Sequence, residues 1–338
     1  MKALFIGFGN VGQRMAEMLF LKEQNLPQFD FPELKITGII TQSRGALLDP
    51  DGIDMKEALL EIQKNGHFKN HKNYTEQLTE QALREWPYDV LVELTTLSIS
   101  DKGEPATNHI IRAIKSGKHV VTANKGPVAF NYDKIKSLAD KMGVHFYGEA
   151  TVMDSAPVFS LSESVLKGGT ITRISGILNS TTNFILTRME SGESFQKALL
   201  AAQENGFAEA DPRHDLDGWD AAAKIAALSN VFMNARTSPL EVHRKGISDI
   251  TEKEVAFQLK KNFRIKLVCK SWFESGQFHA QVAPEMIPMT HPFASISGTS
   301  ACVKFESKHF APVLITHETP TLNDTAHGVI QDLAKLFP

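Results

Sequence analysis

The chain has 338 residues, of which 42% are hydrophobic and 22% charged, and a formal net charge of −3; this composition suggests about two globular domains. It contains no run of Lys and Arg, so nucleic acid is not an expected partner. It also contains no run of 18 apolar residues, so no membrane span is expected. The two cysteines, Cys269 and Cys302, are far apart and neither belongs to a CxxC motif. This pattern excludes a disulfide framework and the usual zinc spacing, and it predicts a reducing, cytoplasmic location.

The first elements predict a dinucleotide-binding unit. Residues 2–7 have the pattern of a buried strand, and residues 13–21 that of a helix. The segment GFGNVG between them has glycines in G-x-G-x-x-G order, which suits a tight turn, close approach of the backbone to a pyrophosphate, and helix packing. The positive helix N-terminus would hold the pyrophosphate, and a purely structural turn is the alternative. The expected cofactor contacts are Gly7, Phe8, Gly9, Asn10, Val11 and Gly12.

The second predicted strand, residues 34–40, decides which nicotinamide cofactor is expected. An acid at the end of this strand would bind a ribose 2′-hydroxyl. The chain has Thr41-Gln42-Ser43-Arg44-Gly45 there, with no acid. Arg44 suits a 2′-phosphate, which favours NADP and leaves NAD open. The alternative for Arg44 is an exposed loop residue, since arginine is mostly exposed.

The middle of the first half predicts a further buried strand. Residues 46–85 have the pattern of a helix, a polar loop and a second helix. Residues 89–94 (DVLVEL) form a nearly continuous apolar run, as in a sheet covered on both faces. Ligands of such sheets bind beyond the carboxyl ends of the strands. We therefore expect the hydroxyl groups that follow this strand to face the cofactor, namely those of Thr95, Thr96 and Ser98.

A lysine follows the next predicted strand. After a helix at 105–115, the strand at 119–123 ends in Asn124-Lys125-Gly126-Pro127. This position places Lys125 beside the nicotinamide, and an ordinary surface lysine is the alternative. A helix at 132–142 and a strand at 144–147 complete a predicted dinucleotide-binding domain at residues 1–148.

The second half predicts a substrate domain at residues 149–321 of mixed helices and strands. A helix at 157–166 and a strand at 170–178 precede a polar loop at 179–183, which opens a helix at 184–189. Donors of this loop, with Asn179 and Thr181 among its residues, suit a substrate carboxylate at a helix N-terminus. Further strands are expected at 263–270, 278–283, 300–305 and 313–316, and a final helix at 325–337.

The segment 202–224 holds five carboxylates in twelve residues: Glu209, Asp211, Asp215, Asp217 and Asp220. A helix is expected from Gly218 to Ala235, with Asp215 or Asp217 as its N-cap. Asp220 and Lys224 are its only charged residues and share one face, four positions apart. The alternative is an ordinary ion pair on a solvated helix face. A helix that is apolar nearly all round is a buried helix, however. Because burying an ion pair is costly, we interpret it as an active-site pair. The spacing of the acids does not fit a calcium loop.

With these motifs in hand, the chain resembles the homoserine dehydrogenase family over nearly its whole length. The segment 202–224 carries the most specific match, and GFGNVG, VVTANKGP at 120–127, GILNSTTNFIL at 176–186 and HPFASISGTSA at 291–301 also match. The resemblance implies an α/β chain with an N-terminal Rossmann-like doubly wound parallel sheet. It also implies a central α+β substrate and dimerisation domain, and a C-terminal helix (322–338) that packs back on the first domain. No separate regulatory domain is expected.

The resemblance implies reversible oxidation of L-homoserine to L-aspartate 4-semialdehyde with NAD(P), in the threonine and methionine branch of amino-acid biosynthesis, by a homodimer. Lys224, Asp220 and Lys125 match the catalytic residues, with Lys224 expected to transfer the proton, and Glu209 and Asp215 match substrate ligands. A monovalent cation, Na⁺ or K⁺, is implied at Glu149, Val152, Asp154 and Ala156. Two departures from the family pattern lie at Met153-Asp154-Ser155 and at residues 317–321, where glycine-rich runs are usual.

Two other functions stay open at this stage. One is a related lysine-dependent NAD(P) dehydrogenase of another small amino acid or a sugar. The other is a non-catalytic dinucleotide-sensing protein, which the two departures suggest. Retention of both lysines and all five acids argues against the second, because such groups are costly to bury without use. A thiol-based aldehyde dehydrogenase is disfavoured, because neither cysteine closely follows the first domain or has an apposed histidine motif.

Overall fold

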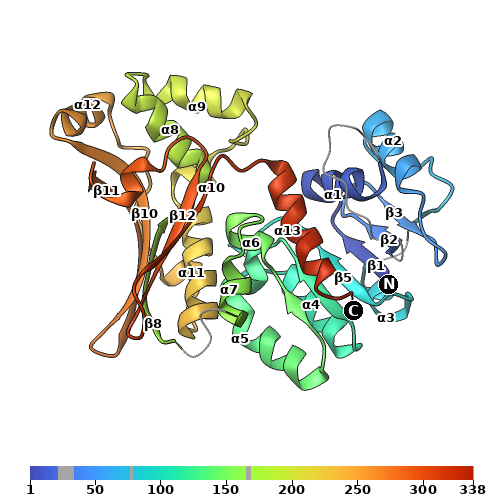
Figure 1. Cartoon of the computed structure of the whole chain (residues 1–338). Coiled ribbons are helices and arrows are strands. Elements are labelled where there is room, and N and C mark those ends of the chain that lie inside the picture. Colours follow the sequence, from blue (N-terminus) through green and yellow to red (C-terminus); the bar gives the residue numbers. More distant parts are fainter. Residues whose placement is uncertain (22–33, 77–78, 165–168, 338) are drawn as a thin grey trace. The chain divides into compact units, whose positions relative to one another are not determined.

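The computed structural model describes residues 1–21, 34–76, 79–164 and 169–337. It divides into two compact units (Figure 1). Unit 1 comprises Met1–Ser155 and Thr321–Pro338, and unit 2 comprises Ala156–Pro320. Helix α6 (Ala150–Met153), expected in the second domain, therefore belongs to unit 1.

Unit 1 is built on a seven-stranded sheet whose order is β4-β3-β2-β1-β5-β6-β7. Strand β1 pairs in parallel with β2 on one side and with β5 on the other. The direction of winding therefore reverses between β1 and β5, which is where doubly wound sheets bind ligands. The strands are β1 (Lys2–Ile6), β2 (Lys35–Ile40), β3 (Ala46–Leu48), β4 (Tyr74–Thr75), β5 (Val90–Glu93), β6 (His119–Thr122) and β7 (Phe146–Tyr147).

Helices cover both faces of this sheet, which confirms the predicted doubly wound α/β fold. Helix α1 (Asn10–Phe20) packs against α2 (Met55–Asn65) and against the C-terminal helix α13 (Leu322–Ala334), which lies beside it in Figure 1. These three helices share one apolar core with β1 and β2. A second group of helices in unit 1 consists of α3 (Thr79–Glu85), α4 (Ala106–Lys115) and α5 (Lys125–Met142). Helix α4 packs against both of the others.

Several predicted elements of unit 1 differ from the structure, and three of the differences have a local explanation. Residues 46–48 form an antiparallel strand beside β2, where a helix was predicted. Helix α5 begins at Lys125 rather than at 132, because the Asn124 side chain accepts from the Gly126 amide and caps it. Pro127 is tolerated in this first turn, where backbone N–H groups have no helical partner. A capping box of Thr321 and Asp324 starts α13 earlier than the predicted residue 325.

Unit 2 is built on a six-stranded sheet whose order is β13-β12-β8-β10-β11-β9. All its strand pairs are antiparallel except β11 with β9. A tight turn at Ser275-Gly276, with φ of 49° and 82°, joins β10 to β11, as expected for a two-residue hairpin. The strands are β8 (Ile171–Ile177), β9 (His243–Arg244), β10 (Phe263–Glu274), β11 (Gln277–Pro288), β12 (Ala301–Ser307) and β13 (Val313–His317).

Helix α11 (Trp219–Met233) is the buried helix of unit 2 and packs on β8, β10 and β11. Its Ala221, Ile225 and Leu228 are completely buried, as its apolar sequence predicted. The predicted N-cap at Asp215 or Asp217 is wrong, because Gly218 occupies that position with a φ of 79°. The other helices are α7 (Val158–Ser164), α8 (Ser180–Glu190), α9 (Phe195–Glu204), α10 (Arg213–Leu216) and α12 (Glu252–Lys260), and the end of the helix predicted at 157–166 lies outside the described residues.

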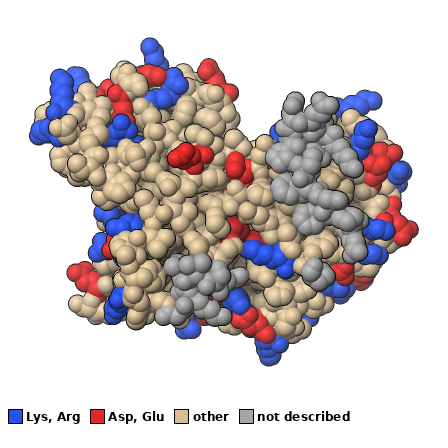
Figure 2. Space-filling view, in the orientation of Figure 1, with Lys and Arg blue, Asp and Glu red and all other residues tan. Residues whose placement is uncertain are grey.

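Within the described ranges, no helix combines the length and apolar character needed to cross a membrane. On the face drawn in Figure 2, acidic and basic side chains are interspersed among the described residues, without a continuous basic field.

Candidate active site

Unit 1 has a cleft of about 600 Å³ at the carboxyl ends of β1, β2 and β5. Many of the side chains and glycines that the sequence assigned to the cofactor lie together in its wall. Asn10 and Val11 begin α1 behind this wall, and Gly12 packs against Phe8 and Leu94. The predicted residues that line the cleft are Gly7, Phe8, Gly9, Arg44, Thr95, Thr96 and Ser98.

The glycine loop fits a pyrophosphate for steric reasons. Gly7 has a φ of 94°, and a Cβ atom there would lie 2.6 Å from the carbonyl of Leu94, so only glycine fits. A Cβ on Gly9 would meet nothing within 4 Å, which leaves its backbone open to a ligand. Gly9 is the N-cap of α1, so an anion in this part of the cleft would meet the positive end of that helix.

Arg44 is half-buried in the wall of the same cleft. Its Nη1 donates to the carbonyl of Phe8 at 3.0 Å, and its backbone amide donates to Oγ1 of Thr41 at 2.9 Å. These bonds hold the guanidinium next to the glycine loop, so Arg44 is not the freely exposed residue that its loop position also allowed. A charged guanidinium here suits a phosphate better than a bare hydroxyl.

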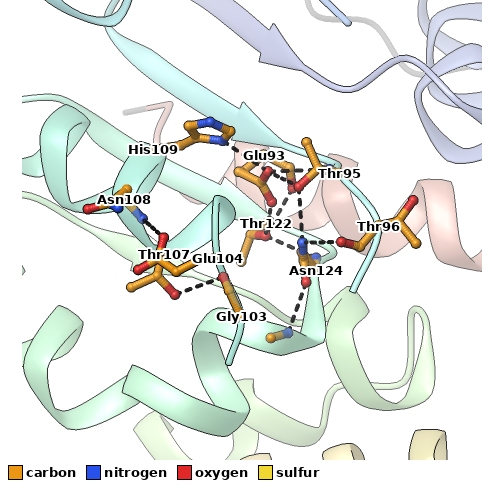
Figure 3. Close-up of polar contacts among 11 residues, drawn as sticks. Glu93, Thr95, Thr96, Gly103, Glu104, Thr107, Asn108, His109, Thr122 and Asn124 are labelled. Atoms are coloured by element: carbon orange, nitrogen blue, oxygen red, sulfur yellow. Dashed lines mark hydrogen bonds and ion pairs between the residues drawn. The ribbon is translucent and has the colours of Figure 1, made fainter. Parts of the chain in front are cut away.

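Glu93, Asn124 and His109, which were not among the residues predicted to bind the cofactor, lie in or next to the cleft wall (Figure 3). Glu93, the last residue of β5, is completely buried and accepts a hydrogen bond from the hydroxyl of Thr95. Asn124 Nδ2 donates to Thr95 Oγ1 at 3.1 Å and to the carbonyl of Thr96 at 3.3 Å. His109, from α4, lines the cleft with its Nδ1 3.5 Å from Glu93 Oε1. An acid inside the apolar run DVLVEL was the one sequence signal for this cluster.

Lys125 is the first residue of α5 and follows directly after β6. It is half-buried, and its position depends on the neighbouring Asn124, whose side chain caps the helix. The backbone of Lys125 therefore lies at a capped helix start that Asn124 links to Thr95 and Thr96.

Unit 2 brings together Asn179, Asp215, Asp220 and Lys224 from three separate parts of the chain. Asn179 Nδ2 donates to Asp215 Oδ1 at 2.6 Å and to Asp220 Oδ2 at 3.0 Å. The Lys224 ammonium donates to the carbonyl of Leu178 at 2.7 Å and lies 3.4 Å from Asp220 Oδ2. The side chains of Lys224 and Asp220 are only 14% and 17% exposed, so this pair is not a solvated surface pair.

The electrostatics of this cluster single out Asp215. Burial raises the pKa of Asp215, and the negative charge of Asp220 raises it further, while the Asn179 amide and the Lys224 charge oppose the shift. A buried carboxyl held among one lysine and another acid has the character of a ligand-binding group. The arrangement is suited to a small cationic or proton-exchanging substrate.

The other predicted substrate residues have different surroundings. Thr181 donates its hydroxyl hydrogen to the carbonyl of Phe207 at 2.7 Å. Glu209 is exposed, and its carbonyl accepts from Gln203 Nε2 at 3.1 Å. No hydrogen bond or ion pair joins the Glu209 carboxylate to the Lys224 cluster among the described residues. Asp211 pairs with Arg213, which lowers the pKa of Asp211 to about 2.

Asn179 and Arg244 fix the backbone around the cluster. Asn179 Oδ1 accepts from the amide of Thr182 at 2.8 Å and caps α8, so one side chain both starts a helix and bridges two acids. Arg244 Nη1 donates to the carbonyl of Asp217 at 2.6 Å, and Arg244 Cζ lies 3.5 Å from the ring centre of Trp219. These contacts hold the turn between α10, which carries Asp215, and α11, which carries Asp220.

The predicted cation ligands have neighbours of their own. The Glu149 carboxylate is buried 3.6 Å from the Lys335 ammonium, and the carbonyl of Asp154 packs against Gly328. The carbonyl of Ala156 accepts from the Val158 amide at 2.7 Å. In the described part of the chain, no group of three or more His, Cys, Asp and Glu side chains could hold a metal ion.

The doubly wound sheet and the glycine-loop cleft at its switch point define unit 1 as a dinucleotide-binding domain. Comparison with known proteins identifies the family. The family model "Homoserine dehydrogenase" matches residues 157–334, and "Homoserine dehydrogenase, NAD binding domain" matches residues 7–149. The chain belongs to the homoserine dehydrogenase family, whose members are NAD(P)-dependent oxidoreductases of amino-acid biosynthesis.

Three relatives illustrate the match. The homoserine dehydrogenase of Methanocaldococcus jannaschii is 36% identical over 100% of this chain and 98% of its own length. The NAD(+)-dependent homoserine dehydrogenase of Pseudomonas canavaninivorans is 33% identical over 98% of this chain and 95% of its own. A hyperthermophilic archaeal homoserine dehydrogenase mutant in complex with NADPH has a TM-score of 0.81 and is 27% identical, covering 100% of this chain and 98% of that chain.

Proposed function

We propose that this chain interconverts L-homoserine and L-aspartate 4-semialdehyde with Lys224 as its acid–base group and Asp220 as the group that orients it. One observation carries the proposal: Asn179 at the start of α8, Asp215 of α10, and Asp220 and Lys224 of the buried helix α11 form one cluster that is largely shielded from solvent. A positioned acid–base group contributes roughly 10²–10⁴-fold to a rate.

In the oxidation of homoserine, the substrate alcohol loses a proton from its oxygen and a hydride from its carbon. Lys224 takes the proton at the oxygen, and in the reverse direction its ammonium returns a proton to the developing alkoxide. Asp220 and the carbonyl of Leu178 hold the amino group in place, at 3.4 and 2.7 Å from Nζ. The nicotinamide, when bound, accepts or supplies the hydride, and no further oxidant is needed.

Asp215 and Asn179 are proposed to bind the substrate. The Asp215 carboxylate suits the substrate ammonium, and Asn179 bridges the two acids by donating to both. Glu209 is proposed to reach the substrate only through a change in its exposed segment. Thr181 is proposed to act by fixing the loop at Phe207, because its hydroxyl hydrogen already has an acceptor there.

For the cofactor, NADP is proposed over NAD. The support is Arg44, held beside the glycine loop by Phe8, together with the absence of an acid at residues 41–45. The relatives include an enzyme named as NAD(+)-dependent and one solved in complex with NADPH, so the family uses both. Lys125, at the start of α5, is proposed to contact the bound nicotinamide.

Three further expectations belong to this proposal. The chain acts in the cytoplasm, as its two buried free cysteines suggest. It works on a small amino-acid substrate without a nucleic-acid or membrane partner, and it forms a homodimer. A monovalent cation at Glu149 and its neighbours remains a prediction, and no step above depends on it.

The test is an absorbance assay of reduced nicotinamide with purified protein, L-homoserine and each of NADP and NAD. L-Serine and L-threonine serve as matched amino-acid alcohols. Homoserine-dependent reduction, much faster than with either control, is expected. Reduction with none of the three would overturn the proposed reaction, and a preference for a control would move the chain to another amino-acid alcohol.

A further inference from the structure

A buried carboxyl group lies directly below the cofactor cleft, although it does not line the cleft itself. We propose that Glu93 is a positioning residue: its carboxylate sets the direction of a hydrogen-bond chain that fixes the start of α5 and, with it, Lys125. This inference rests on the proposed function for its kinetic consequences. Its structural part stands on the contacts drawn in Figure 3.

Glu93 is completely buried at the carboxyl end of β5, and hydroxyl groups surround it. Thr95 donates to its Oε1 from the hydroxyl and, at 3.4 Å, from the backbone amide. The Thr122 hydroxyl lies 2.9 Å from the Glu93 carbonyl and 3.4 Å from its Oε2. Burying a carboxylate costs folding free energy unless hydrogen-bond donors satisfy it. The fold places these donors where they satisfy the Glu93 carboxylate.

The chemistry of the donors then fixes the direction of every bond in the chain. An ionised carboxylate can only accept, so the single hydroxyl hydrogen of Thr95 goes to Glu93. Thr95 Oγ1 can then only accept, and it receives a hydrogen from Asn124 Nδ2 at 3.1 Å. The same amide nitrogen donates to the Thr96 carbonyl at 3.3 Å. These two acceptors leave one orientation for the Asn124 amide.

That orientation presents Asn124 Oδ1 to the amide of Gly126, which donates to it at 2.9 Å. This bond caps α5, whose first residue is Lys125. Gly126 is also fixed sterically, since a Cβ on it would lie 2.8 Å from Gly103. The charge on Glu93 is thus connected, through Thr95 and Asn124, to the backbone on either side of Lys125.

His109 gives the carboxylate a further neighbour. Its ring is buried on α4, and its Nδ1 lies 3.5 Å from Glu93 Oε1 without forming a hydrogen bond in the described structure. His109 also lines the cleft. Its imidazole has no part in the chain of hydrogen bonds from Thr95 to Gly126.

The test compares Glu93→Gln and Thr95→Val with Thr95→Ser, which keeps the hydroxyl, and with Thr37→Val. Thr37 is a matched control, because it is a completely buried threonine of the same sheet whose hydroxyl donates to Ala3 and Pro87, away from this cluster. In Glu93→Gln the new amide can itself donate to Thr95 Oγ1, so the bond from Asn124 to Thr95 is no longer fixed and only the Thr96 carbonyl still accepts from the Asn124 amino group.

The first readout is hydrogen exchange of the Gly126 amide, which needs no activity. Exchange should become at least tenfold faster in Glu93→Gln and Thr95→Val and stay within about threefold of wild type in Thr95→Ser and Thr37→Val. Unchanged exchange in Glu93→Gln would overturn the proposal, as would an equal acceleration in Thr37→Val, which would indicate general loosening of the sheet.

The second readout separates kcat from cofactor binding. Small misplacements of reacting groups cost up to about 10²-fold in rate, so kcat should fall at least tenfold in Glu93→Gln and Thr95→Val. The Kd for NADPH, measured by its fluorescence, should stay within about threefold in Glu93→Gln, because Glu93 does not line the cleft and Gly9 and Arg44 are untouched. Thr95→Ser should recover most of kcat. Wild type inactive on homoserine would contradict the proposed function alone, whereas active wild type with unchanged kcat in Glu93→Gln would contradict this inference alone.

Discussion

The Lys224 ammonium lies 3.4 Å from Asp220 Oδ2, one helical turn away on a helix that is otherwise apolar. Both side chains are more than four-fifths buried, and Asn179 bridges the acid of this pair to Asp215. An ion pair in such a place stabilises the fold little, because removing two charges from water costs several kcal/mol per ion. The pair is therefore better explained by chemistry than by stability.

Replacing Lys224 with Ala should lower kcat at least 10²-fold, because the proposed acid–base role supplies that much. The Kd for NADP should stay within a few-fold, since the glycine-loop cleft belongs to unit 1. Lys270→Ala is the matched control, because Lys270 is also a lysine of unit 2 in an ion pair, with Glu285. A Lys224→Ala variant that retains more than a tenth of wild-type kcat would remove Lys224 from the proton transfer.

Replacing Asp215 with Asn should raise KM for homoserine at least tenfold, because a neutral amide no longer attracts the substrate ammonium. The exposed Asp211, paired with Arg213 in the same segment, provides the control variant Asp211→Asn. Steady-state kinetics with saturating NADP measure both. An equal KM for the two variants would show that the Asp215 carboxylate is not a substrate ligand.

Replacing Arg44 with Asp should shift the preference from NADP toward NAD, because an acid repels a 2′-phosphate and accepts from a 2′-hydroxyl. The quantity to measure is kcat/KM for each cofactor in both proteins, and we expect their ratio to change at least tenfold. Arg14→Ala, at a helix surface pair with Glu17, controls for loss of positive charge. An unchanged ratio would show that Arg44 only donates a hydrogen bond to the Phe8 carbonyl and does not select between the two cofactors.

Much of the fold could be predicted because its signals are local. Each of these signals can be recognised within about a dozen residues: the apolar strands, the glycine loop and the nearly all-apolar helix around Lys224. The short strand β3 could not be predicted, since three residues have no period and its pairing with β2 is a tertiary contact. The start of α5 was missed because Gly126 and Pro127 resemble a loop, whereas the Asn124 cap and the first-turn position make both acceptable.

The candidate site also has a part that the sequence could predict and a part that it could not. Asp220 and Lys224 are one turn apart on one helix, so their pairing could be read from spacing. Asn179 was expected to serve a substrate carboxylate, but its amide donates to Asp215 and Asp220, which lie 36 and 41 residues further along the chain. Glu93 was read as part of a core strand, because nothing local reveals that Thr95, Thr122 and Asn124 converge on it.

The buried Asp332 of α13 should make stability depend on pH in a predictable direction. Burial raises the pKa of Asp332 to about 6, against an ordinary value of 3.8, although Lys335 opposes the shift. Between these two pH values the unfolded chain has released this proton and the folded chain still binds it. The free energy of unfolding therefore falls as pH rises through this window. Asp332→Asn removes this contribution and keeps an oxygen for the Glu149 amide, which donates at 2.7 Å.

The Tm of Asp332→Asn, relative to wild type, should consequently increase between pH 4 and pH 6 and then level off. Asp140→Asn is a suitable control, because Asp140 is an exposed acid of the same unit. A Tm difference that stays constant across this range would show that Asp332 titrates as an ordinary acid.

The chain should form a homodimer through unit 2. Strand β13 stands at one end of its sheet and pairs only with β12 among the described strands, and a bare edge strand invites pairing or covering. Large apolar side chains are exposed on the same sheet, including Phe273, Met286 and Leu314 at 44%, 59% and 38%. Closed two-fold dimers are the commonest oligomers.

Light scattering at micromolar concentration should therefore give about twice the 37.4 kDa chain mass. A Leu314→Lys variant should lower this mass toward the monomer, while Leu60→Lys, at a leucine of unit 1 that is 57% exposed, should leave it unchanged. A monomer mass for wild type across a dilution series would refute the dimer.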